Sequence, residues 1–184
     1  MKRIFSSIFL LLVFGFLFLS NAKAGEREDN FVNLAMSGDV DGVRSLLDQG
    51  VDVNAKDSHG NTALTGAIMS YHQVPDRNYM EVVQLLLARG ADINEIGRLG
   101  YTPLISAEIG GEADIVRILI DKGANVNKKG HSGGTALMDA NEKLEKGRMT
   151  GFDASFNPIY APLTPTERET YTNIVRMLQA AGAK

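Results

Sequence analysis

The amino-acid sequence predicts an all-α solenoid, because two phrases recur along the chain at linked spacing. The first has two apolar residues, two variable residues, Gly and a stretch ending in Asn; it occupies 46–54, 86–94 and 119–127, with a truncated copy at 177–183. The second, Gly-x-Thr-x-Leu, follows each full copy at 60–64, 100–104 and 133–137. From Gly100 to Gly133 the period is 33 residues, which is typical of stacked helix pairs.

Together the phrases resemble the ankyrin repeat, in which a Thr-Pro-Leu-His turn begins the first helix and a Leu-Leu-x-x-Gly-Ala-x-x-Asn stretch ends the second. The resemblance extends over roughly residues 28–184. It implies an ankyrin-repeat solenoid of about four helix–turn–helix repeats with short β-hairpin fingers. The repeats would occupy about 28–57, 58–97, 98–130 and 131–184.

The chain departs from the family pattern at two positions. The His of the turn is replaced by Thr65, Ile105 and Met138. The Asp before the turn is kept as Asp57 but is replaced later by Gly97 and Gly130. We expect these departures to loosen the second and third fingers without changing the fold.

The first 24 residues are predicted to be a signal peptide. Lys2 and Arg3 precede an apolar stretch from Ile8 to Leu19, and Ala22-Lys23-Ala24 has the small-x-small pattern of a cleavage site. An uncleaved membrane anchor is the alternative, but a span needs roughly 20 apolar residues. We therefore expect residues 25–184 to be periplasmic or secreted by a bacterium, without stable membrane insertion.

Charge and cysteine content narrow the function classes. Without Lys2, Arg3 and Lys23, 16 of the 19 basic residues remain against 22 acidic ones, a net charge of −6. That balance argues against nucleic acid as a partner and modestly favours a partner with a basic face. The absence of Cys excludes disulfides and thiolate zinc sites.

The first two repeats differ in length. Apolar stripes at 31–35 and 40–47 predict the helices of the first repeat. Gly50 and its counterparts lie where a helix end favours a left-handed residue. The interval from Gly50 to Gly90 is 40 residues, so the second repeat carries an insertion near 71–78.

The third repeat is regular, whereas the fourth contains a long insertion near 147–163. A helix is predicted at 136–146, before the insertion. The last helix should begin at Thr164-Pro165-Thr166-Glu167, which combines an N-cap Thr, Pro at the first helical position and Glu at the third. The insertion holds Phe152, Phe156 and Tyr160; it would cap the last repeat, form a recognition loop, or do both.

No catalytic constellation, metal site or cofactor is expected. His59 and His131 lie in fingers two repeats apart, roughly 20 Å at about 10 Å per layer, so they cannot share a metal. His72 stands in the first insertion without an acid pair at ligand spacing. Asp52, Asp92 and Asn125 recur at the repeat period, which favours a structural role in turns.

The family resemblance implies that the finger tips and the exposed ends of the first helices bind a protein on the concave side. The matching finger residues are Lys56, Ser58, His59, Asn61, Ile96, Arg98, Leu99, Tyr101, Lys129, His131 and Gly134. The matching helix residues are Met69, Ser70, Ile109, Glu142 and Lys143. Arg98 and Tyr101 are the first candidates, because Arg and Tyr are enriched at binding hot spots. Ile96 and Leu99 could instead pack against a neighbouring finger.

The sequence thus predicts an exported, non-enzymatic, monomeric module that holds one folded protein in a concave groove. Resemblance to exported bacterial ankyrin proteins implies one alternative, an oxidative-stress accessory supporting catalase or haem delivery, with His72, Tyr71 or Tyr101 as a haem ligand. Another alternative is an inhibitor or immunity protein for a periplasmic enzyme.

Overall fold

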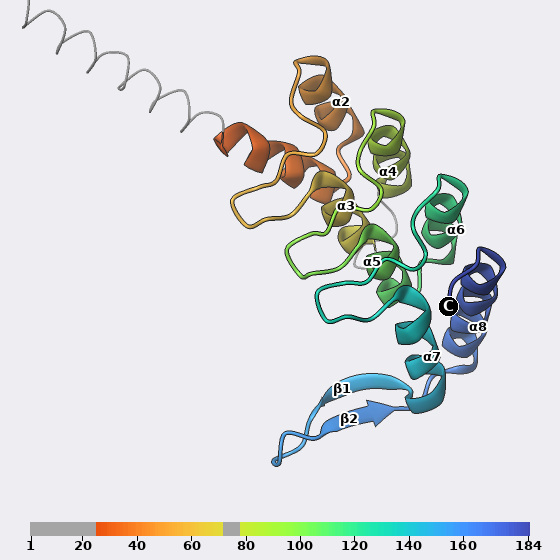
Figure 1. The fold of residues 1–184 in the computed structure, drawn as a ribbon. Coiled ribbons are helices and arrows are strands. Elements are labelled where there is room, and N and C mark those ends of the chain that lie inside the picture. Colours follow the sequence, from red (N-terminus) through yellow and green to blue (C-terminus); the bar gives the residue numbers. More distant parts are fainter. Residues whose placement is uncertain (1–24, 72–77) are drawn as a thin grey trace, which may run out of the picture.

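The computed structural model describes residues 25–71 and 78–184, which form a curved stack of helix pairs (Figure 1). Helical residues 25–37 precede α2 (Val40–Asp48). The later pairs are α3 (Ala63–Tyr71) with α4 (Tyr79–Ala88), α5 (Pro103–Gly110) with α6 (Ala113–Asp121), and α7 (Ala136–Lys146) with α8 (Pro165–Ala180). The predicted fold class is confirmed. The predicted signal peptide and most of the first insertion, including His72, lie outside the described residues.

Helix ends form where the sequence predicts them. The Oγ1 atoms of Thr102 and Thr135 accept hydrogen bonds from the backbone three residues on. At α8, Thr164 and Glu167 form the predicted reciprocal capping box, with Pro165 as the first helical residue. The glycines after α2, α4 and α6 have φ of 83°, 87° and 89°, values that a residue with a Cβ atom adopts only at a cost.

The helices bury one continuous apolar core between the two rows of the stack. Its largest fully buried side chains include Phe31, Leu64, Leu86, Leu119 and Ile174. Each helix pair covers only its neighbours, so stability is built up repeat by repeat. Among the described residues, no helix has both the length and the apolar character needed to cross a membrane.

Neighbouring repeats are also joined by a ladder of asparagine side chains. Local turns are closed as predicted: Oδ1 of Asp52, for example, accepts a hydrogen bond from Asn54 N at 3.0 Å. Asn54 and Asn94, however, reach the next repeat, where their Oδ1 atoms accept from Asp92 N at 2.7 Å and Asn125 N at 2.8 Å. Asn127 accepts from Lys184 N in the same way, at 2.8 Å. We call this line of bonds the amide ladder.

Three fingers and one arm project from the same side of the stack (Figure 1). The fingers are residues 51–62, 91–102 and 124–135, and the first contains a β-bridge between Lys56 and Thr62. The arm, residues 148–161, consists of strand β1 (Arg148–Phe152) paired antiparallel with β2 (Pro158–Ala161). Within the described residues, the regular strand pairing is thus in the insertion of the fourth repeat.

Candidate protein-binding surface

The first finger is held by the carboxylate of Asp57. Its Oδ1 accepts hydrogen bonds from His59 N at 2.9 Å and Asn61 N at 2.7 Å, and its Oδ2 accepts from Asn61 Nδ2 at 2.9 Å. Burial raises the pKa of Asp57, but these hydrogen bonds outweigh burial, so the net pKa lies below its ordinary value. The turn leaves Ser58 and His59 exposed at the tip.

The second and third fingers use close backbone packing instead. A Cβ atom at Gly97 would lie 2.7 Å from Thr65 Oγ1, and one at Gly130 would lie 2.7 Å from Gly100 O. The backbone N–H of His131 donates to Gly100 O at 2.8 Å, which joins these two fingers directly. The expectation that both glycines loosen the fingers is therefore wrong, because their small size permits the contact.

The first and second fingers are joined by side chains. Lys56 Nζ lies 2.6 Å from Glu95 Oε1 and donates to Ile96 O at 3.3 Å. Asp29, from the first helix, accepts a hydrogen bond from Ser58 N. Contacts within the protein thus engage two finger acids, Asp57 and Glu95, together with Asp29 of the first helix.

The candidate residues of the second finger fall into two groups. Ile96 and Tyr101 are half-buried, whereas Arg98 is exposed and Leu99 is 55% exposed. Ile96 contacts the first finger through its backbone, since its carbonyl oxygen accepts the hydrogen bond from Lys56. Leu99 and Arg98 remain available to a partner.

The other candidates extend the surface along the stack. Lys129 and His131 are exposed on the third finger, Asn61 and Met69 are half-buried, and Ile109 is exposed at the end of α5. Of the residues considered as haem ligands, Tyr71 and Tyr101 are half-buried. Across residues 25–71 and 78–184, no three His, Asp or Glu side chains are arranged to hold a metal ion.

A buried ion pair joins α5 to α7 near the base of the arm. Glu108, fully buried on α5, accepts a hydrogen bond at Oε1 from Lys143 Nζ of α7 at 3.0 Å. Lys143 Nζ also donates to Ile109 O at 3.4 Å and lies 4.7 Å from the centroid of the Tyr171 ring. Glu108 Oε2 has no hydrogen-bond partner among the described residues.

Burial raises the pKa of Glu108 to about 7, although Lys143 opposes the shift. A carboxyl group whose pKa is raised on folding binds its proton more tightly in the folded state. Its contribution to stability is therefore greatest below the ordinary value of 4.5 and is lost as the pH rises towards 7. Sequence reasoning missed Glu108; the signal was a carboxylate at the repeat position where Ile68 is buried in the preceding repeat.

Two hollows flank the base of the arm. One, of about 180 Å³, is lined by Ile109, Met149, Tyr160 and polar residues of α7. The other, of about 490 Å³, lies between Ile109, Met149, Tyr171 and the beginning of α8. The arm is anchored there by a hydrogen bond from Tyr160 Oη to Glu142 Oε1 at 3.3 Å. An ion pair between Arg148 and Glu167 at 3.1 Å holds its other strand.

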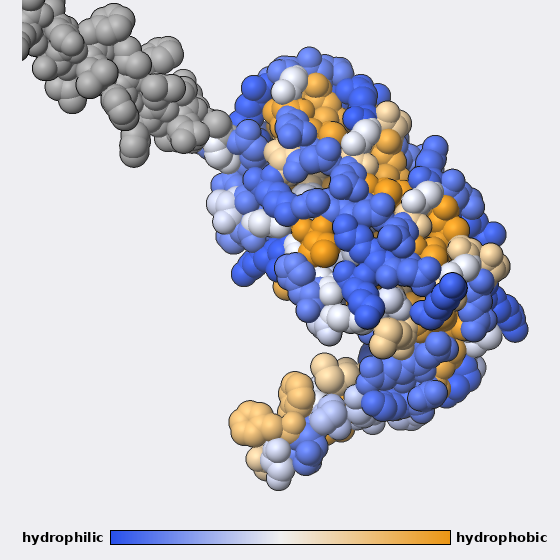
Figure 2. Space-filling model, viewed as in Figure 1, coloured by the Kyte–Doolittle hydropathy of each residue, from blue (hydrophilic) through white to orange (hydrophobic). Residues whose placement is uncertain are grey.

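Away from this base, the arm carries exposed apolar side chains and does not cap the last repeat. Phe152 is 59% exposed and Phe156 is 87% exposed. Figure 2 shows the arm as a separate protrusion with an apolar tip and a recess between it and the rest of the stack. The capping interpretation is therefore wrong for the outer part of the insertion; within residues 147–163, the one apolar side chain that is buried, Leu163, lies beyond the arm.

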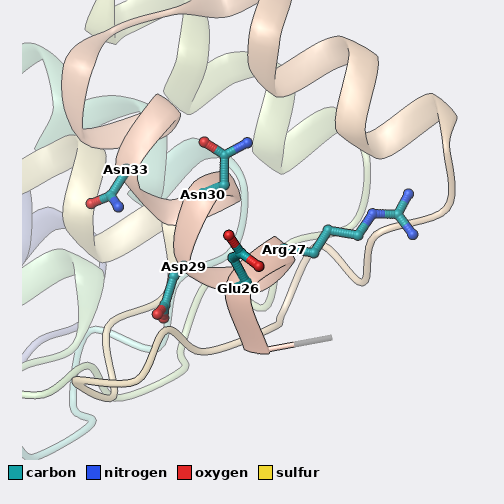
Figure 3. A pocket seen from close by; sticks show the side chains of 5 residues that line it. All are labelled: Glu26, Arg27, Asp29, Asn30 and Asn33. Carbon is teal, nitrogen blue, oxygen red and sulfur yellow. The ribbon is translucent and has the colours of Figure 1, made fainter. Parts of the chain in front are cut away.

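A further hollow, of about 530 Å³, lies along the first helix and is lined by Glu26, Arg27, Asp29, Asn30 and Asn33. Figure 3 shows these side chains fanning outward, with Arg27 extending away from the others. Arg27 donates to Gln49 O at 2.9 Å and Asp29 accepts from the first finger. The group therefore fastens the first helix to its surroundings and does not converge on a common point.

The tip of the arm repeats the turn of the first finger. Asp153 Oδ1 accepts from Ser155 N at 2.7 Å and Asn157 N at 3.0 Å, and its Oδ2 accepts from Asn157 Nδ2 at 3.1 Å. The backbone bond from Asp153 N to Asn157 O, 2.9 Å, matches the one from Asp57 to Asn61. The recurrence of Asp and Asn four residues apart was the sequence signal for this turn, and sequence reasoning did not use it.

Stacked helix pairs with projecting fingers define a repeat protein that acts through its surface. A family model described as "Ankyrin repeats (3 copies)" matches residues 8–96 and 74–147, together more than half of the chain. The chain belongs to the ankyrin repeat family.

Curated relatives share the repeats over part of their length. The chain is 36% identical over 86 residues to serine/threonine-protein kinase 12 of Arabidopsis thaliana, covering 45% of this chain and 17% of the relative. It is 38% identical over 78 residues to ankyrin repeat and SOCS box protein 6 of Homo sapiens, covering 39% and 18%. With the 2-5A-dependent ribonuclease of Mus musculus it shares 35% over 85 residues, covering 46% and 11%.

The chain spans less than a fifth of each of these relatives, so the kinase and ribonuclease activities in their names are not carried over to it. Ankyrin repeats are a protein–protein interaction module, and the fold is generally non-enzymatic. A protein is accordingly the class of partner that the family indicates.

Proposed function

We propose that the chain is an exported binding module that holds a folded protein against its fingers and arm, on the concave side of the stack. The observation that carries this proposal is the recess between two projecting parts, the fingers and the arm, with exposed apolar residues on both. Leu99 on the second finger and Phe152 on the arm are each more than half exposed. Apolar anchors surrounded by polar residues are the usual composition of a binding surface.

The fingers offer charges of both signs to a partner. Arg98 and Lys129 are exposed, and no ion pair is formed by either among the described residues. Lys56 is paired with Glu95, while the finger residues Asp52 and Asp92 are exposed. The partner should therefore complement this mixed pattern, because complementarity depends on the charges at the contact.

The proposal is tested by placing a photoreactive phenylalanine analogue at Leu99 in the full chain and irradiating it in the native host. We expect a protein adduct at position 99. The matched control is the same analogue at Gln84, which is exposed on α4 in the outer row of helices. The double substitution Arg98→Ala and Tyr101→Ala should reduce the adduct at 99 at least ~10-fold.

Equal adducts at positions 84 and 99, or none at 99, would contradict the concave site. The identity of the adduct separates the versions of the proposal. A catalase or haem protein would assign the chain to oxidative stress, and a toxin or hydrolase would make it an inhibitor or immunity protein. Fractionation of the host tests the predicted export, which cytoplasmic recovery of the uncleaved chain would overturn.

A further inference from the structure

The tip of the arm holds an aromatic residue in a backbone conformation that favours glycine. Phe156 has φ of 62°, and its backbone N–H donates to Asp153 O at 3.0 Å. In the matching turn of the first finger, the corresponding residue is Gly60, with φ of 84°. For a bulky side chain this left-handed region is an outlier, and among the described non-glycine residues Phe156 alone occupies it.

No contact within residues 25–71 and 78–184 accounts for a phenylalanine at this position. The side chain is 87% exposed, so it contributes almost no burial to the fold. The turn is complete without it, because Asp153 and Asn157 supply the hydrogen bonds. Strained residues that persist without a structural role cluster at sites that bind or react.

The arm also holds the backbone from which the ring projects. Asp153 accepts hydrogen bonds from three N–H groups across the tip, and Thr150 Oγ1 donates to Ile159 O at 3.2 Å in the strands behind it. At the base, Gly147 approaches Ala161 too closely to allow a Cβ atom, and Tyr160 is bonded to α7. A backbone held in this way loses little freedom when it binds.

We propose that Phe156 is an anchor that inserts into an apolar pocket of the protein partner held against the fingers. This inference rests on the proposed function, since the arm projects on the same side as the fingers and continues that surface (Figure 1). A lipid surface is the weaker occupant. The tip carries Asp153 and no basic residue, so anionic headgroups do not attract it.

The first experiment places the photoreactive analogue at Ser155, whose side chain leaves Phe156 in place. We expect a protein adduct whose cross-linked residues line an apolar pocket, and we expect Phe156→Asn to abolish it. An adduct with lipid, an adduct with a second copy of this chain, or no adduct at 155 would overturn the inference. The Leu99 probe, read in parallel, reports on the proposed function separately: an adduct at 99 alone upholds the binding module and removes the anchor.

The second experiment measures the affinity of the cross-linked partner for three full-length proteins. Phe156→Asn keeps the turn, because Asn tolerates the left-handed conformation, and it should weaken binding at least ~30-fold. Phe152→Thr, the matched control, removes a neighbouring exposed ring from a strand and should have a smaller effect. Hydrogen exchange of the β1 and β2 amides that is no faster in Phe156→Asn than in the wild type excludes a misfolded arm as the cause. Affinity within about threefold of wild type, or an equal loss in Phe152→Thr, would contradict a single anchor at Phe156.

Discussion

The turn of the first finger and the tip of the arm have the same hydrogen bonds but different surroundings. In both, an Asp carboxylate accepts two backbone N–H groups and the side chain of an Asn four residues on. The finger turn has Gly60 at the left-handed position and is packed between neighbours; the arm turn has Phe156 there and stands in solvent. The Asp carboxylate and the Asn amide therefore define this turn. The residue at its left-handed position can differ and can serve another function.

The largest loss of stability is expected when the turn of the first finger is broken. Asp57→Ala removes the acceptor of three hydrogen bonds in a half-buried turn and should lower the free energy of unfolding by about 3 kcal/mol. Asp153→Ala, the matched change in the arm, should leave the melting temperature of the stack unchanged, because the tip residues are exposed and the bonds of Asp153 lie within the tip. Thermal unfolding followed by circular dichroism measures both; equal losses of stability would show that the arm is part of the cooperative unit.

A second substitution tests whether the Asp turn can be transferred to the second finger. Gly97→Asp restores the family residue, yet its Cβ atom would lie 2.7 Å from Thr65 Oγ1 on the buried helix α3. We expect a loss of about 2 kcal/mol from overpacking. In a double-mutant cycle with Thr65→Ala, measured by urea unfolding, the combined loss should be smaller than the sum. A stabilised Gly97→Asp would mean that the close packing of this finger is dispensable.

Substitutions at the left-handed position of each turn should have smaller effects, destabilising in the finger and stabilising in the arm. Gly60→Ala should cost about 1 kcal/mol, since space is available but the backbone conformation is unfavourable for a Cβ atom. Phe156→Asn should make the arm more protected, which hydrogen exchange of the β1 and β2 amides measures. Slower exchange at the arm together with weaker binding would show that strain is retained at the tip for function; faster exchange would refute the strain.

Acid titration should have the smallest effect and still separates the two turns. The folded-state pKa of Asp57 is lowered overall, so its contribution to stability is present above the ordinary value of 3.8 and is lost as the pH falls through the folded-state pKa. Hydrogen bonds from Asn157 and Ser155 lower the pKa of Asp153 too, but its protonation should loosen only the arm. Urea unfolding between pH 5 and about 2 should therefore be less pH-dependent in Asp57→Asn than in the wild type. If the unfolding free energy of Asp57→Asn depends on pH as strongly as that of the wild type, groups other than Asp57 cause the acid sensitivity.

The fold could be predicted from the sequence at positions where a residue acts on its own neighbours in the chain. Gly50 ends a helix, Thr164 and Glu167 begin one, and both roles depend on neighbours in the chain. The sequence was misleading where the contact is made between repeats. Gly97 suggested a loosened finger because its partner, Thr65, lies 32 positions earlier and is met only after stacking.

The residues of the candidate surface also divide into those that the sequence predicted and those that it did not. Arg98 and Leu99 could be selected from the repeat register and are exposed in the structure. The buried state of Glu108 and the left-handed backbone of Phe156 were missed, although the position shared with Ile68 and the Asp–Asn spacing shared with the first finger were signals for them. One depends on the lysine that α7 brings to α5, and the other on a turn closed from both sides by Asp153 and Asn157.

The amide ladder has a mechanical consequence. It ties each repeat to the next along a single line, through Asn54, Asn94 and Asn127. Deformations that stretch this line break hydrogen bonds, whereas rotations about it keep them. The repeats should thus rotate about the amide ladder. This rotation changes the gap between the fingers and the arm, while the spacing of the repeats along the ladder stays constant.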